Sequence, residues 1–140
     1  MTNLFRQHIH IYHRIADSPA ANPFSMENAA SRIAADLQAS RFEISFEQAF
    51  ERLESLPRMF IELDGSFVWS GQQDASRWQI DGMLYDRNGR LQRAELAGQA
   101  PRHHWEQLLN IFGQPLDTLT IHCLQQQRFI QPAEFLEREF

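Results

Sequence analysis

The chain has 140 residues, of which 43% are hydrophobic and 11% aromatic, which argues against intrinsic disorder and fits one domain, residues 1–140, with one core. The net charge of −5, with acidic and basic residues interspersed, argues against a nucleic-acid-binding module, and no apolar run approaches the roughly 18 residues of a membrane span. Since Cys123 is the only cysteine, no internal disulfide can form, and we expect a soluble, cytoplasmic protein.

The first predicted element is an amphipathic helix from Leu4 to Ala16, where apolar side chains recur at helical spacing. On this helix His8 falls on the apolar side, while His10 and His13 fall on the polar side. A helical pair of histidines at this spacing can chelate a metal ion, but no nearby Cys or Glu completes a site. We therefore expect a solvated face and no bound metal.

Two more helices are predicted after a break that carries two prolines. Ser25 is expected to cap a helix that runs to Leu37. Ser45 and Gln48 have the spacing of a capping box, which predicts the start of a third helix that Pro57 ends.

Asp64-Gly65 lies between two apolar runs, 59–63 and 66–69, and predicts a β-hairpin. In any register this hairpin carries apolar side chains on both faces. We therefore expect the helices to cover one face and a partner protein or a second copy of the chain to cover the other. The candidate partner-binding residues are Phe60, Phe67, Val68 and Trp69.

Asn88-Gly89 marks a second hairpin, and residues 72–77 read as the polar connection between the two. A two-residue loop would scatter apolar side chains over both faces, so we favour a type I turn over 86–88 with Gly89 left-handed as a bulge. This register pairs Ile80 with Leu96, and it sets Asp81 opposite Glu95 as a like-charge pair. The apolar side chains that it places on one face are Trp78, Ile80, Leu84, Ala94 and Leu96.

The remaining elements are a helix from Pro101 to Phe112, a strand over 116–124, a short strand at 129–130 and a short helix from Pro132. We expect an α+β fold, with an antiparallel β-meander of four to six strands and helices packed mainly on one face. The expected order is three helices, four strands, a helix, one or two strands and a helix. In a small acidic chain, the sequence of helix, three or more strands, helix, two strands and helix within this order resembles that of the class I type III secretion chaperones. The resemblance implies a dimer that binds extended segments of client proteins.

No sequence motif for catalysis or for a cofactor is present. The phosphate loop and the patterns GxGxxG, GxSxG and HExxH are absent. His122 and Cys123 cannot pair as base and nucleophile, because adjacent strand residues point to opposite faces. Trp69 and Trp78 would stack on bases or a peptide if exposed, but their strand positions favour the core. We expect no cofactor.

These patterns favour a non-enzymatic protein-interaction module that binds a partner protein or forms a homodimer, with no nucleic-acid or membrane partner. The alternative is a small-ligand binder or an enzyme whose unrecognised site lies near His122, His8 or Glu62. A further alternative is a client binder of the secretion-chaperone kind, as the order of elements implies.

Overall fold

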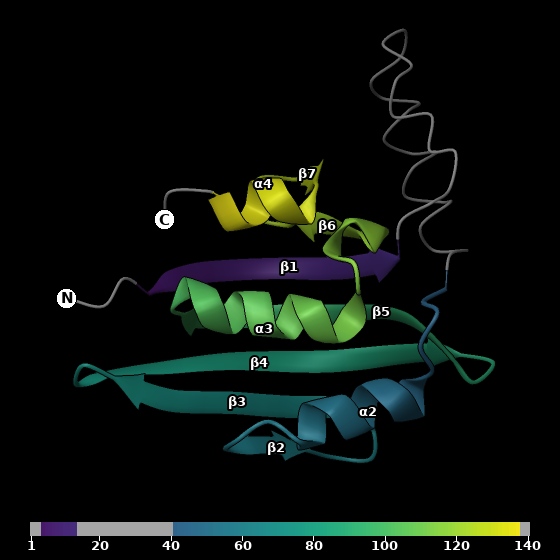
Figure 1. The fold of residues 1–140 in the computed structure, drawn as a ribbon, viewed down its shortest axis with the longest axis horizontal. Helices are drawn as coiled ribbons and strands as arrows, with labels where there is room; N and C mark the ends of the chain where they lie inside the picture. The colour runs from purple at the N-terminus through teal and green to yellow at the C-terminus, as the bar shows by residue number, and fades with distance from the viewer. Residues whose placement is uncertain (1–3, 14–40, 138–140) are drawn as a thin grey trace, which may run out of the picture.

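In the part of the chain that the structure describes, seven strands form one antiparallel sheet in the order β2-β3-β4-β5-β1-β6-β7, and three α-helices pack on one of its faces (Figure 1). The computed structural model describes residues 4–13 and 41–137. The strands are β1 (Phe5–His13), β2 (Met59–Ile61), β3 (Ser66–Gln73), β4 (Ser76–Arg87), β5 (Arg90–Ala100), β6 (Leu119–Cys123) and β7 (Arg128–Ile130). The helices are α2 (Phe46–Glu54), α3 (Arg102–Phe112) and α4 (Pro132–Glu137), with a short 3-10 turn, η1 (Leu116–Thr118).

The N-terminal segment is a strand, so the predicted helix from Leu4 to Ala16 is wrong. Strand β1 lies between β5 and β6 and pairs with both, and its side chains alternate between the two faces of the sheet. Ile9 and Ile11 point into the core, and neither is exposed to solvent. Hydrogen bonding to two neighbours outweighs the local helical pattern of this segment. The second predicted helix, Ser25 to Leu37, lies outside the described residues.

The third predicted helix is confirmed as α2. The Ser45 hydroxyl accepts from the Gln48 amide at 3.1 Å, and the Gln48 side chain accepts from the Ser45 amide at 2.9 Å. This reciprocal pair satisfies amide donors that the first turn of a helix leaves free. Ala49 and Leu53 of α2 are buried against the sheet, and the helix ends before Pro57.

The second predicted hairpin is confirmed, but its predicted turn and register are wrong. The loop is the two-residue Asn88-Gly89, with φ of 57° and 80°, as a type I′ turn requires. Gln92 is the extra residue of a bulge in β5, between the pairs Tyr85–Arg93 and Asp86–Leu91. Ile80 therefore pairs with Gly98, and Asp81 pairs with Ala97. The predicted like-charge pair of Asp81 with Glu95 therefore does not form.

The predicted core face of this hairpin is nevertheless confirmed. The two-residue loop and the bulge each move the register by one position, so each β4 residue pairs two positions beyond the predicted β5 residue. Because side chains alternate between the faces of a sheet, a displacement of two positions leaves the same side chains on one face. The five predicted side chains are at most 2% exposed: Trp78, Ile80, Leu84, Ala94 and Leu96.

A third hairpin, between β3 and β4, replaces the polar connection predicted over 72–77. Its two-residue turn is Asp74-Ala75, with φ of 51° and 66°, and Gln73 pairs with Ser76. Such turns favour Asn-Gly or Asp-Gly because both central residues have positive φ, and Asp74-Ala75 lacks that glycine signal. Strands β2 to β5 therefore form a continuous meander.

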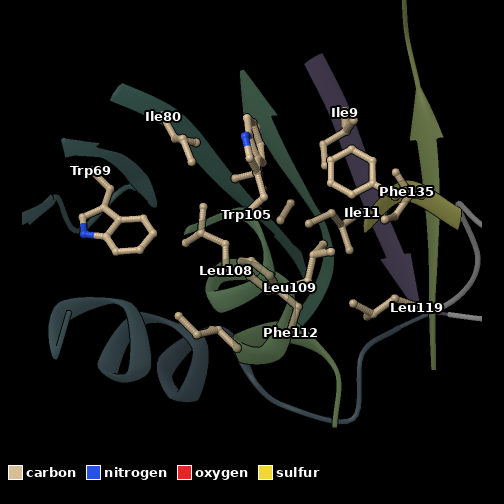
Figure 2. Close-up of a cluster of buried hydrophobic side chains, with 14 of the residues drawn as sticks. Ile9, Ile11, Trp69, Ile80, Trp105, Leu108, Leu109, Phe112, Leu119 and Phe135 are labelled. Carbon is tan, nitrogen blue, oxygen red and sulfur yellow. The ribbon is translucent and has the colours of Figure 1, made fainter. Parts of the chain in front are cut away.

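The C-terminal elements largely follow the predictions. Helix α3 buries its predicted stripe of Trp105, Leu108, Leu109 and Phe112. The strand predicted over 116–124 is shorter, because η1 occupies its first residues. Figure 2 shows how side chains from α3, α4 and the sheet interlock between the two layers. The opposite side of the sheet, called here the open face, is not covered by any described helix (Figure 1).

Candidate interaction surface

Exposed large apolar side chains gather on the hairpin of β2 and β3. Among the described residues, the exposed large apolar side chains are Phe60, Leu63 and Val68, with exposed fractions of 64%, 88% and 36%. Phe60 and Val68 are cross-strand partners and point to the open face. We call these three side chains the hairpin patch. Since β2 is an edge strand, the patch lies at one edge of the sheet.

The structure divides the four predicted partner-binding residues between the two faces of the hairpin. Phe60 and Val68 are exposed on the open face, whereas Phe67 and Trp69 point into the core and are only 3% and 1% exposed. The Trp69 indole N–H donates to the Pro57 carbonyl at 2.9 Å. Phe67 and Trp69 therefore hold the hairpin on the core, and only Phe60 and Val68 are accessible to a partner.

A polar network centred on Glu95 occupies the middle of the open face. The Glu95 carboxylate accepts from Arg93 Nε at 2.8 Å and from the Tyr85 hydroxyl at 3.4 Å, and it lies 3.5 Å from His10 Nε2. The Arg93 guanidinium also lies 3.9 Å above the Tyr85 ring, in a cation–π contact. These contacts join β4, β5 and β1 on one surface.

Three histidines extend this network toward β6. The rings of His8 and His122 lie 6.0 Å and 6.1 Å from that of His10, and His122 stacks on Phe129 at 4.4 Å. Burial lowers the pKa of His10, and the negative charge of Glu95 opposes that shift. Burial also lowers the pKa of His122. Near neutral pH both imidazoles are therefore held toward their uncharged form.

The sequence anticipated part of this arrangement. His122 lies opposite the buried Cys123, as the strand alternation predicts. The helix wheel placed His8 and His10 on different sides, whereas the strand puts both on the open face and turns His13 to the other. Read as an alternating strand, the segment from His8 to Tyr12 would have indicated this grouping.

Of the three residues named for the alternative site, the structure brings His8 and His122 to the open face on either side of His10, but not Glu62. Three strands separate β2 from β1 in the sheet, so Glu62, which follows β2, lies apart from His8 and His122. Within residues 4–13 and 41–137, no group of three His, Cys, Asp or Glu side chains is arranged to hold a metal ion. A shallow recess of about 460 Å³ lies beside His8, and its lining includes Arg6, Gln79, Asp81, Ala97 and Gln99.

A cluster of aromatic rings lies where α3 meets the meander. The His104 ring stacks on Trp78 at 4.0 Å and meets Trp69 edge-on at 5.0 Å. Burial, helped by the neighbouring His103, lowers the pKa of His104 to about 4. Both tryptophans are 1% exposed, so the prediction that they lie in the core is confirmed, and neither ring is accessible to a base.

Comparison of the chain with protein-family models, with curated proteins and with solved structures found no match. Helices long and apolar enough to cross a membrane are absent from the part of the chain that the structure describes.

Proposed function

We propose that this protein is a non-enzymatic interaction module that associates with a second copy of itself through the hairpin patch. The observation that carries this proposal is the concentration of exposed apolar surface on one hairpin, in Phe60, Leu63 and Val68. Burial of apolar surface is the main favourable term in protein association. Such a cluster on one surface is typical of an interaction site.

The surroundings of the patch support an interface. Glu62 and Asp64 are exposed next to it, and the polar side chains of the open face continue from Val68 across β4. Protein interfaces commonly combine an apolar centre with a polar rim. In a twofold dimer the same patch faces itself, so Phe60 of each copy would lie near the symmetry axis.

Sedimentation velocity over a range of concentrations tests this proposal. We expect the wild-type protein to sediment as a dimer and the double variant Phe60→Ser, Leu63→Ser to sediment as a folded monomer. Ala133→Ser, at an exposed position on α4 toward the opposite edge, is the matched control and should remain dimeric. A wild-type protein that stays monomeric at every concentration would overturn the proposal, as would a double variant that remains a dimer.

The recess beside His8 supports a second candidate, a binding site for a small polar molecule. Asp81 and Arg6 offer opposite charges there, and Gln79 and Gln99 offer amide donors and acceptors. The small side chain of Ala97 leaves the recess open, so the longer side chain in Ala97→Met should fill it. A thermal-shift screen with sugars and amino acids should find a ligand that stabilises the wild type but not this variant. A screen in which no compound separates the two proteins would argue against the site.

The order of elements supports a third candidate, a client binder of the secretion-chaperone kind. From α2 to α4 the chain runs helix, four strands, helix, two strands and helix, which agrees with the order that this resemblance implies. Strand β1, in the middle of the sheet, has no counterpart in that order. A dimer that protects an extended client segment from proteolysis would favour this candidate over self-association alone.

A further inference from the structure

Strand β3 continues beyond the last residue that β2 pairs with. Strand β2 pairs with β3 only from Phe67 to Trp69, so residues 70–72 have β4 on one side and no described strand on the other. The Ser66 carbonyl accepts from the Glu62 amide on the β2 side, and the Ser70 carbonyl accepts from Arg58 Nε on that same side.

Backbone groups of alternate residues point to the same side of a strand. Because the carbonyls of Ser66 and Ser70 both point toward the β2 side, the amide and carbonyl of Gln72 point there as well. Strand β2 has ended by this point, so these groups of Gln72 face outward. Unpaired groups of this kind are a template for an additional strand.

Two arginines border this edge. A recess of about 490 Å³ is lined by Arg58, Ser70, Gly71, Gln72 and Arg77. Both arginines are exposed, and within the described residues neither forms an ion pair with a carboxylate. In a chain with a net charge of −5, this recess contains positive charge and no acidic side chain.

Arg58 is held in place at the recess. Its Nε donates to the Ser70 carbonyl at 3.0 Å, and its guanidinium carbon lies 6.0 Å from the centre of the Trp78 ring. The bond uses one of the five N–H groups of the guanidinium, so the others remain available to an anion. Arg77 pairs with Gln72 across the ladder and borders the recess from β4.

We propose that the outer edge of β3 at residues 70–72 binds an extended acidic segment of a partner protein, which adds to the sheet as a strand there. Backbone hydrogen bonds to the outward groups of Gln72 would supply sequence-independent affinity, and carboxylates paired with Arg58 and Arg77 would supply selectivity. An added strand with an acidic residue at every second position presents its carboxylates on one face. This site is distinct from the hairpin patch.

Fluorescence anisotropy with three labelled eight-residue peptides tests the proposal. The first peptide alternates Val and Glu, the second alternates Val and Lys, and the third is the Val–Glu peptide with alternate backbone nitrogens methylated. We expect only the first to bind, because the second lacks the carboxylates and the third lacks backbone donors on one edge. Equal binding of the Val–Lys peptide would overturn the acidic specificity.

Protein variants locate the binding site. Arg58→Gln and Arg77→Gln should each weaken binding of the Val–Glu peptide about tenfold, the scale of one lost charge-assisted contact. Arg87→Gln removes an exposed arginine at the far end of the same strand as Arg77, and it should leave binding unchanged. If neither recess variant weakens binding, or if Arg87→Gln weakens it equally, the proposed site is wrong.

Amide hydrogen exchange separates strand addition from simple anion binding. The bound Val–Glu peptide should slow exchange of the Gln72 amide. If inorganic phosphate displaces the peptide completely and the methylated peptide binds as well as the first, the recess is an anion site only and the proposed strand addition is wrong. Sedimentation of Arg77→Gln should match that of the wild type, so failure of this proposal is distinguishable from failure of self-association at the hairpin patch.

Discussion

The imidazole of His104 stacks on the indole of Trp78, with ring centroids 4.0 Å apart and planes inclined by 24°. His104 belongs to the first turn of α3 and Trp78 to β4, so the contact joins the helix layer to the sheet. His104 Nδ1 also lies 3.0 Å from the side-chain oxygen of Gln107. The positive end of a helix dipole and burial both disfavour a charged imidazole at this position.

This contact predicts a pH dependence of stability. The folded protein holds the pKa of His104 near 4, below its ordinary value of 6.5. Between these two values the unfolded chain binds a proton that the folded protein does not, so the contribution is complete above pH 6.5 and is lost as the pH falls toward 4. Urea unfolding across this range should show a smaller decline in His104→Gln than in the wild type. An NMR titration of His104 with a midpoint near 6.5 would contradict this prediction.

The two faces of the first hairpin should respond differently to truncation. Phe67→Ala removes a buried ring and should lower the free energy of unfolding by about 3–5 kcal/mol. Phe60→Ala, on the exposed face, should change it by about 0.5 kcal/mol or less in the monomeric protein. Urea denaturation of both variants in the Leu63→Ser background, where the hairpin patch is disrupted, provides the measurement. Similar losses in the two variants would be inconsistent with the described burial.

Gly82 should not tolerate a larger residue. It is the cross-strand partner of Phe67, whose ring occupies the space that a Cβ at position 82 would need. Gly82→Ala should therefore lower the free energy of unfolding by about 1–3 kcal/mol, the usual cost of overpacking. Phe67→Leu should relieve part of that cost, and a double-mutant cycle measures the coupling. Additive losses in the cycle would show that the ring and the glycine do not share this space.

Glu95 should control the protonation of His10. Its carboxylate raises the pKa of His10 against the effect of burial, so Glu95→Gln should lower that pKa further. The stability change should be small, on the order of 0.2–1 kcal/mol, because the ion pairs of Glu95 are partly exposed. An NMR titration of His10 measures the shift, with Glu106→Gln on α3 as the control. A His10 pKa that is unchanged or higher in Glu95→Gln would contradict the described network.

Local signals account for the elements that could be predicted from the sequence. The capping box of Ser45 and Gln48 and the apolar stripe of α3 both depend on residues only three or four positions apart in the chain. Strand β1 could not be identified in this way, because Gln7 occupies a buried position and breaks the apolar alternation. Its partners β5 and β6 are distant in sequence, so the sheet contacts that determine its conformation leave no local signal.

The candidate site was predictable to a similar degree. Apolar residues on both faces of the first hairpin indicated Phe60 and Val68, but the pattern could not separate them from Phe67 and Trp69, since that requires knowing which face α2 covers. The sequence alone could not predict that Arg58 and Arg77 border the same recess. Their proximity depends on the turn at Asp74-Ala75, which lacks a glycine, and on where β2 ends.

The position of β1 between β5 and β6 has a kinetic consequence. Phe5 pairs with Ala100 and Ile9 with Cys123, so both ladders of this strand close over most of the chain. Closing such long loops costs conformational entropy before the stabilising contacts between the strands form, and this slows folding. The β2–β5 meander can form from neighbouring segments, whereas β6 and β7 join it only through β1. Deleting β1 would therefore divide the sheet into two separate pieces rather than shorten it at an edge.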